Sequence, residues 1–343
     1  MELPVRIAPA DDAMELYATG FNAWNQLTFD PSAAKDEPDD IFSFTKILGT
    51  QRLDRVVSQM CYTAVQREGT WSLAGLSPGT LVSGKADQRY LFDHPSAVSA
   101  DGRVLTVEGL GRPSQAIVEY PALAAWRANR NTHSWPSESG VRQIAAYDGG
   151  FVILHEDTSV STMGDPRFGD CLGREVDESR YLHRHPTRLM ADLHSPADVP
   201  SLVSDLSDIG EPIKKVAAGG YTLAALTEGG GLYLWGMQSP GSQSRHQAFT
   251  DLSGMPNYVE VDGEKDVQDI ALGESHAIAL TTDGCVYVVG DNTNGQLGLG
   301  SSFKSPVESW VKVPFITPPG WDIVGVEVGP RSSFIVTAKA KPK

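Results

Sequence analysis

The sequence predicts an all-β protein, a single β-propeller built from repeated blades. The first supporting observation is that pairs of apolar runs joined by tight turns recur along the 343 residues. The second is that a glycine ends each pair, at residues 20, 75, 109, 164, 236 and 290. Such a period indicates a propeller, a solenoid or an array, and units made only of strands, without a helical period, favour the propeller. The third observation, complementary chain ends, is described below.

The clearest unit lies at residues 268–300. Its apolar runs, residues 277–280 and 286–289, predict strands that are buried on both sides. The dipeptide Asp283-Gly284 joins them, and Asp-Gly between apolar runs is a strong hairpin signal. Gly290 then begins a glycine-rich exit loop, where a positive φ or a close backbone approach excludes a Cβ atom.

Other copies of this unit precede it along the chain, and the copy at residues 213–236 is the clearest of them. They lie at residues 56–75, 90–109, 141–173 and 213–236. In the copy at 90–109, His94 takes the place of His276. A further strand-like run follows several exit loops, and we expect these runs to be the outer strands of four-stranded blades: residues 42–45, 116–120, 258–261 and 310–313.

The two chain ends complement each other. Residues 16–27 match 286–297 but have no first strand before them, whereas residues 324–337 supply a first strand with no second strand after it. We therefore expect one blade to be completed by both ends, which would leave no free sheet edge in the ring. The predicted propeller spans residues 14–338, and residues 1–13 and 339–343 are predicted to be tails.

The segment 174–210 interrupts the period and is rich in Asp, Ser, His and Pro. We interpret it as a polar insertion on one face of the propeller. Its His183, His185, Asp192 and His194 raise the question of a metal site. Exposed histidines in a polar insertion are the favoured interpretation, because no cysteine or Glu-x-x-His spacing accompanies them. We predict no metal and no cofactor.

Composition narrows the function classes. No apolar run approaches the length of a membrane span, and the N-terminal residues lack the pattern of a secretory signal. The three cysteines are far apart and odd in number, which suits a reducing compartment, so we expect a cytosolic or nuclear protein. The formal net charge of −15 disfavours direct nucleic-acid binding and favours basic partners.

A catalytic interpretation of His276, with Glu274, Ser275 and Asp283 near it in sequence, is weaker than a structural one. His276 occupies a repeat position, and a repeat supplies no triad geometry. We predict no catalytic residue. The residues that we expect to serve the repeat itself are Gly20, Gly75, Gly164, Gly236, Gly284, Gly290 and His276.

The pattern from Gly273 to Gly298, G-x-S-H-x-x-A-L-T-x-D-G in outline followed by V-Y-x-x-G-x-N-x-x-G-Q-L-G, resembles the repeat of the regulator-of-chromosome-condensation superfamily. Residues 17–27 and 216–236 carry clear copies of it. The resemblance extends over nearly the whole chain and implies a propeller, usually of seven blades. Six units are legible, so either a degenerate seventh blade lies between Gly109 and Val141 or the ring is smaller.

The resemblance implies a binding protein rather than a catalyst. Among short members, the chain is similar in size and closure to the killer-toxin-insensitivity propeller, which binds a small zinc protein of diphthamide synthesis and serves Elongator-dependent tRNA modification. It is also similar to a propeller that partners a JmjC oxygenase. The alternative implied by the founding member is guanine-nucleotide exchange on a Ran-type GTPase, although its basic tail has no counterpart here.

Partner-binding residues are expected where the copies differ. Trp24 and Phe168 stand at the same point of their exit loops, where aromatic side chains serve either as partner anchors or as packing between blades. The other candidates are acidic: Asp165, Asp291, Glu175, Asp177 and the cluster Asp36-Glu37-Pro38-Asp39-Asp40. Acidic clusters are usually solvated loops, and here they could also steer a basic partner.

Overall fold

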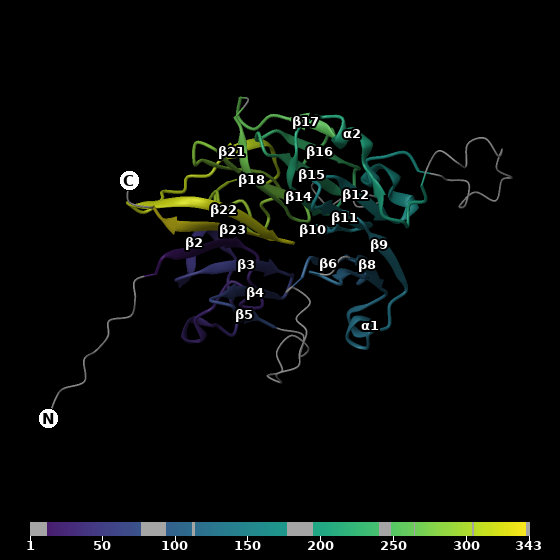
Figure 1. Ribbon diagram of the computed structural model, residues 1–343. Coiled ribbons are helices and arrows are strands. Elements are labelled where there is room, and N and C mark those ends of the chain that lie inside the picture. Colours follow the sequence, from purple (N-terminus) through teal and green to yellow (C-terminus); the bar gives the residue numbers. More distant parts are fainter. Residues whose placement is uncertain are drawn as a thin grey trace, which may run out of the picture.

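The protein is a six-bladed β-propeller (Figure 1). The computed structural model describes residues 12–76, 94–111, 114–176, 195–239, 248–263, 265–303 and 305–340. These residues form six antiparallel sheets arranged around a ring, which confirms the all-β prediction and agrees with the smaller of the two expected rings. The described residues between Gly109 and Val141 join an existing sheet and form no blade of their own.

The blades are named here in chain order after the closure blade. The closure blade holds β22 (Trp321–Gly329), β23 (Ser332–Lys339), β1 (Met14–Gly20) and β2 (Ile41–Thr50). Blade 2 holds β3 (Leu53–Ser58), β4 (Tyr62–Arg67) and β5 (Thr70–Gly75). Blade 3 holds β6 (Ser96–Val98), β7 (Val104–Glu108), β8 (Gln115–Tyr120) and β9 (His133–Ser137).

The other three blades have four strands each in the described residues. Blade 4 holds β10 (Val141–Tyr147), β11 (Gly150–His155), β12 (Val160–Gly164) and β13 (Ser201–Leu202). Blade 5 holds β14 (Ile213–Gly219), β15 (Thr222–Thr227), β16 (Leu232–Gly236) and β17 (Asn257–Val259). Blade 6 holds β18 (Val267–Leu272), β19 (His276–Thr281), β20 (Val286–Gly290) and β21 (Val307–Lys312). Short helices lie in the connections: η1 (Pro31–Ala33), α1 (Leu123–Arg127), η3 (Pro166–Leu172) and α2 (Ser204–Ser207).

The two ends of the chain complete one blade, as predicted. Strand β1 pairs with β23 without interruption, from Met14 opposite Ala338 to Gly20 opposite Ser332. On its other side β1 pairs with β2, so the closure sheet is built from two C-terminal and two N-terminal strands. Figure 1 shows the purple N-terminal strands beside the yellow C-terminal ones.

The hydrophobic core lies between the sheets. Six clusters of buried apolar side chains occur in the described residues, and each joins two successive blades, including the closure blade and its neighbours on both sides. In the cluster between the closure blade and blade 2, Phe334 packs with Val65. Burying an aliphatic or aromatic side chain contributes roughly 1.5–3 kcal/mol. Because each blade is stabilised mainly by its two neighbours, the ring depends on every interface.

A hairpin turn shared by the copies, between β19 and β20 in blade 6 and between β6 and β7 in blade 3, explains why degenerate copies keep their spacing. In blade 6, Thr281 Oγ1 donates to Asp283, whose carboxylate also accepts from the amide of Cys285. In blade 3, Ser99, Asp101 and Arg103 repeat these contacts, with Ser99 Oγ donating to Asp101 and the Arg103 amide to the same carboxylate. The register that places residues 94–102 over 276–284 is therefore supported by a shared turn.

Two local expectations for blade 3 were wrong. His94 is exposed and, among the contacts of the described residues, makes none like the buried ones of His276. Residues 116–120 were expected to be an outer strand, yet β8 lies between β7 and β9. The chain turns back through α1, and Glu119 is then buried between Arg103 Nη1 at 3.0 Å and His133 Nδ1 at 3.0 Å. Strand β9, with the sequence HSWPS, is polar and contains Pro136, so its sequence pattern is that of a loop.

The segment 174–210 contributes to blade 4 at both of its described ends. Arg174 is buried, and its guanidinium donates to backbone carbonyls that include those of Ser195 and Pro196. Strand β13 pairs with β12, and α2 buries Leu206. The remaining part, with Asp177, His183, His185, Asp192 and His194, lies outside the described residues, so the interpretation as an insertion on one face stays a prediction.

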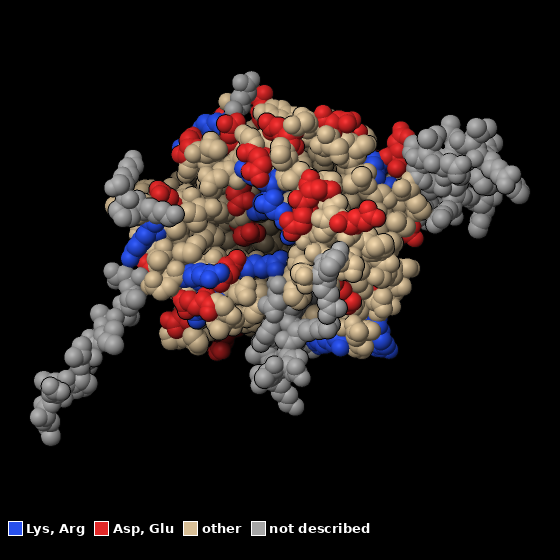
Figure 2. All heavy atoms as spheres, in the orientation of Figure 1, with Lys and Arg blue, Asp and Glu red and all other residues tan. Residues whose placement is uncertain are grey.

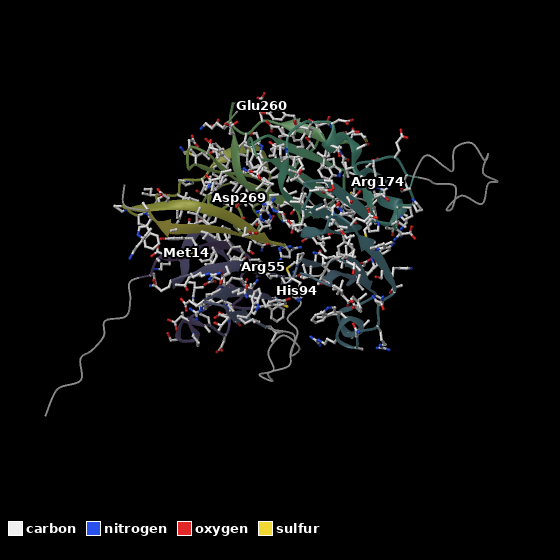
Figure 3. All side chains as sticks on the ribbon, in the orientation of Figure 1. Met14, Arg55, His94, Arg174, Glu260 and Asp269 are labelled. Atoms are coloured by element: carbon white, nitrogen blue, oxygen red, sulfur yellow. The ribbon has the colours of Figure 1, made fainter. Side chains whose placement is uncertain are left out.

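A repeated bulge shapes the inner ring of first strands. Strands β3, β10, β14, β18 and β22 each show a register shift near their first residues. In blades 5 and 6 the residue after this shift reaches the next blade. Lys215 Nζ contacts Asp269 Oδ1 at 2.6 Å, and the other oxygen of Asp269 accepts from the amide of Val326 at 2.9 Å. Figure 2 shows a hollow near the middle of one face with charged side chains of both signs around it, and Figure 3 shows Asp269 and Arg55 toward that middle.

Asp269 thus joins blade 5, blade 6 and the closure blade. Burial works against the charged Lys215, but the nearby carboxylates of Glu327 and Asp269 raise the pKa of its ammonium group above the usual range. The substitution Asp269→Ala leaves that charge without its nearest carboxylate and the Val326 amide without an acceptor. We expect a loss of about 2–4 kcal/mol in the free energy of unfolding, measured by chemical denaturation. Asp322→Ala, at an exposed position of β22, is the control and should cost less than about 0.5 kcal/mol; equal losses would contradict the bridging role.

Candidate functional site

A groove of about 660 Å³ lies where the exit loop of the closure blade meets blade 6. Its lining residues come from three segments, 22–28, 33–45 and 300–302. The first two belong to the N-terminal part of the chain and the third to the C-terminal part. The volume is within the range of about 300–1,000 Å³ that is typical of ligand-binding sites.

The two exit loops beside the groove have the same internal construction. In the closure blade, Asn22 Oδ1 accepts from the amide of Leu27, and Gln26 Oε1 accepts from the amide of Trp24. In blade 6, Asn292 accepts in the same way from Leu297, and Gln296 from Asn294. The asparagine and glutamine of the repeat therefore hold the loop in shape, which leaves the side chains between them to vary.

Contacts between distant segments fix the floor of the groove. The carboxylate of Asp40 accepts from the Asn22 amide at 3.0 Å and from Asn294 Nδ2 at 2.8 Å, so it ties both exit loops together. The amide of Gly300 donates to the carbonyl of Phe42 at 2.8 Å, beside a bridge between Ser43 and Leu299. The groove consequently exists only in the closed ring.

The segments that line the groove carry acidic side chains, of which Asp39 and Asp40 are lining residues, and exposed aromatic side chains next to lining residues. Trp24 is 49% exposed, and Phe303, directly after the lining residue Ser302, is 44% exposed. Asp36, Glu37 and Asp39 are exposed in the segment that follows η1. Figure 2 shows that Asp and Glu side chains also gather elsewhere on the molecular surface. Trp24 was predicted as a partner anchor, and its exposure leaves it available for that role, which stays a prediction.

Two of the predicted acidic residues are committed to their own loops. Burial opposes the charged form of Asp291, but hydrogen bonds from Ser305, Thr293 and Gln296 hold its pKa below the usual value. Asp165 begins η3 as its N-cap, and the hydrogen bonds from Arg167 lower its pKa as well. Both carboxylates stabilise exit loops, so little of their hydrogen-bonding capacity remains for a partner.

The other predicted residues lie on blade 4, away from the groove lining. Phe168 is half-buried and packs against Tyr221 of blade 5, with ring centroids 5.1 Å apart. Of its two expected roles, this geometry supports packing between blades. Glu175 is exposed near the end of a described range, and Asp177 lies outside the described residues. The structure thus brings Trp24 and the 36–40 cluster together, but not with Phe168, Asp165 or Glu175.

Sequence reasoning missed the contribution of residues 300–302 to this site. The 36–40 cluster was visible as an acidic run, whereas residues 300–302 lie more than 250 positions away and have no charge. The available signal was the likeness of residues 16–27 to 286–297. If these are equivalent loops of neighbouring blades, they must lie side by side once the ring closes.

His276 is a structural residue of the blade interface. It is 1% exposed, and its Nε2 lies 3.1 Å from Ser333 Oγ of the closure blade. A Cβ atom on Gly273 would lie 2.1 Å from the imidazole ring, so the glycine makes room for it. Burial lowers the pKa of His276 to about 4, which keeps the ring neutral at physiological pH.

The geometry separates His276 from Asp283. His276 begins β19 opposite Gly290, whereas Asp283 lies in the turn after the other end of that six-residue strand. Asp283 contacts Thr281, Cys285 and Lys265 there. The cavity beside His276 has a volume of about 20 Å³, which is space for about one water molecule. Within the described ranges, no group of three or more His, Cys, Asp or Glu side chains could hold a metal ion.

The predicted structural glycines are needed for two different reasons, a positive φ angle or a lack of space for a Cβ atom. Gly290 has a φ of +107°, and a Cβ atom there would lie 2.3 Å from the Ser275 carbonyl oxygen. Gly20, Gly75 and Gly236 also have positive φ and equally close backbone neighbours, while Gly284 has positive φ in its open turn. Gly164 is the exception, because its space is filled by the Tyr147 hydroxyl, 2.2 Å from where a Cβ atom would lie.

Comparison with solved structures identifies the fold. The chain matches the crystal structure of Prp20p from Saccharomyces cerevisiae with a TM-score of 0.56 and 14% identity, over 99% of this chain and 94% of that one. It matches human WBSCR16 with a TM-score of 0.53 and 18% identity, over 96% and 85%. Two family models, both described as the regulator of chromosome condensation (RCC1) repeat, match residues 267–296 and 283–336.

The chain is an RCC1-like β-propeller. Among curated relatives, the human X-linked retinitis pigmentosa GTPase regulator is 23% identical over 322 residues, which is 87% of this chain and 29% of that protein. The human regulator of chromosome condensation is 34% identical over 122 residues, 34% of this chain and 28% of that protein. The matched region therefore spans less than a third of the length of these relatives.

The burial of neutral His276 gives the RCC1-like propeller a pH dependence. The imidazole pKa is about 4 in the folded state against about 6.5 in the unfolded state, so the unfolded chain binds a proton first as the pH falls. Stability should be constant with respect to this group above about pH 7 and fall between about pH 6.5 and 4. We expect a loss of about 1 kcal/mol between about pH 7.5 and 5.5, measured by urea denaturation. His276→Gln should remove this part of the slope, and an unchanged slope would contradict the assignment.

Proposed function

We propose that this RCC1-like propeller is a non-catalytic protein-binding subunit or adaptor, and that its partner binds at the groove between the closure blade and blade 6. The observation that carries the proposal is the groove itself, with exposed Trp24 in the loop between the lining residues Asn22 and Asn25. Exposed large aromatic side chains are over-represented among the residues that contribute most to protein binding.

The polar residues of the repeat are occupied by structural hydrogen bonds, which supports a binding function over a catalytic one. His276, Asp283 and Asp291 are each engaged in contacts that shape a blade or a loop. The turn contacts of Asp283 recur in blade 3, as expected of residues that specify the fold. By contrast, Trp24 differs from Asn294 at the equivalent point of the loop in blade 6, and its exposed side chain has no such structural role among the described contacts.

Within this class, our first candidate is a role with the small zinc protein of diphthamide synthesis and in Elongator-dependent tRNA modification, in the cytosol or nucleus. Its support is the resemblance in size and terminal closure to the short propellers of that pathway. Partnership with a JmjC oxygenase is supported on the same basis. The three free cysteines suit a reducing compartment.

Guanine-nucleotide exchange is the second candidate. One relative is described as a GTPase regulator, and Prp20p was solved with a description of its binding properties to Gsp1p and histones. These names belong to the relatives, but they make a Ran-type GTPase a specific partner to look for. A GTPase retained only in its nucleotide-free state would favour this candidate over an adaptor role.

Substitution of Trp24 tests the binding site. Partners captured from a native extract by the immobilised chain should be lost with Trp24→Ala, with affinity reduced about 30-fold or more if the side chain is a hot spot. Tyr258→Ala, an aromatic of similar exposure (54%) on blade 5, should capture normally. Mass spectrometry of the captured protein then separates a zinc protein, an oxygenase and a GTPase.

The two variants also define the contradictory outcomes. Both must first show the circular dichroism and denaturation midpoint of the parent chain within a small margin. Capture that survives Trp24→Ala would place the partner elsewhere on the propeller. Equal loss in both variants would indicate a non-specific dependence on exposed aromatic area, which the proposal does not predict.

A further inference from the structure

We propose that the groove takes an extended, lysine- or arginine-bearing segment of the partner protein, whose basic side chains meet Asp36, Glu37 and Asp39. This inference rests on the proposed binding function and adds the chemical nature of the bound segment. It follows from the acidic character of residues 30–40, from the carboxylates in that segment that have no structural contact among the described residues, and from the edge of strand β2, which lines the groove.

The segment that supplies the charged lining residues of the groove, Lys35, Asp39 and Asp40, is predominantly acidic. Residues 30–40 contain five carboxylates and one lysine, in a chain whose formal net charge is −15. That lysine, Lys35, contacts Asp39 at 3.2 Å, with 64% of its side chain and 87% of that of Asp39 exposed. An exposed ion pair of this kind is worth less than about 1 kcal/mol, so an incoming basic group can replace Lys35 at small cost.

The carboxylates of this segment divide into two groups by their contacts. Asp40 accepts from Asn22 and Asn294 and holds the loops together, and Asp30 accepts from Ser32 and caps η1. Asp36 and Glu37 are exposed and have no ion-pair partner among the described residues. Within the described ranges, the Asp39 side chain has only the exposed contact with Lys35. Asp39 therefore lines the groove, and Asp36 and Glu37 precede the lining residue Pro38 in the same segment. All three are open to solvent, and the described contacts give them no structural function.

The shape of the groove suits an extended chain. Strand β2 is the outermost strand of the closure blade and lines the groove through residues 41–45. Beyond the bridge between Ser43 and Leu299, the outer edge of β2 faces no other strand within the described part of the chain. An exposed sheet edge offers main-chain hydrogen bonds to an extended segment, while flanking side chains select its sequence.

The exposed side chain of Trp24, in the loop that contributes lining residues, fits the same occupant. Guanidinium and ammonium groups bind favourably over the face of a tryptophan ring, by about 0.5–1 kcal/mol at exposed sites. Trp24 and the carboxylates could then contact successive side chains of one segment. A polyanion such as a nucleic acid would instead meet uncompensated repulsion along residues 36–39, since its binding depends on a basic surface.

Selection from a library of random dodecapeptides displayed on phage tests this inference before the native partner is identified. The immobilised full chain should enrich peptides that contain Lys and Arg. A synthetic copy of an enriched peptide should bind about tenfold more weakly to the triple variant Asp36→Asn, Glu37→Gln, Asp39→Asn, measured by fluorescence anisotropy at low salt. Asp40 is left unchanged because it supports the loops.

The matched control removes the same number of charges elsewhere. Asp208→Asn, Asp251→Asn and Glu260→Gln change exposed carboxylates in the segments of blades 4 and 5, with Glu260 at the periphery in Figure 3. This variant should bind the peptide as the parent chain does. Equal weakening in both variants would show an effect of net charge alone and would overturn the inference, as would a selected pool that is not basic or the absence of any selected peptide.

The experiments distinguish failure of this inference from failure of the proposed binding function. If Trp24→Ala abolishes capture of the native partner while the triple acidic variant retains full affinity for it, the groove is a binding site but its occupant is not a basic segment. If neither change affects the native partner, both proposals fail. Loss of the native partner with both changes, and with neither control, supports the two together.

Discussion

The pairing of β1 with β23 is the constraint on which the rest of the structure depends. Successive residue pairs, from Met14 opposite Ala338 to Gly20 opposite Ser332, join the two ends of the chain. Without them the closure blade would be split, and the apolar clusters on both of its sides would lose one wall. Since every blade is stabilised largely by its neighbours, a local opening at this seam would weaken the ring as a whole.

The same seam creates the proposed binding site. The closure places the exit loop after β1 beside that of blade 6, where Asp40 and Asn294 connect them across 254 positions of sequence. The groove residues are therefore supplied by both ends of the chain, and they come together only when the ring is closed. Partner binding at this groove would in turn stabilise the closed ring, because a ligand of the folded state alone shifts the folding equilibrium toward it.

The repeat made most of the fold predictable. The features that the sequence did not predict are those that depart from the repeat. Gly290, His276 and the Asp283 turn can be recognised because their sequence pattern follows from backbone geometry. Strand β9 escaped prediction because its polar residues and Pro136 resemble a loop. Its pairing with β8 places His133 opposite the buried Glu119, a contact between segments that local patterns do not show. At the candidate site, Trp24 and the acidic run were visible in sequence. Their juxtaposition with residues 300–302 is a tertiary consequence of closure that local patterns do not encode.

Hydrogen–deuterium exchange of the full chain, alone and with its purified native partner, would decide whether the seam between the chain ends is the binding site. We expect added protection in the groove segments 22–28, 33–45 and 300–302, together with slower exchange in β1 and β23. Blade 4, including the exit loop that carries Phe168, should be unchanged. Protection confined to blade 4, or to the central hollow around Asp269, would contradict the assignment of binding to this seam.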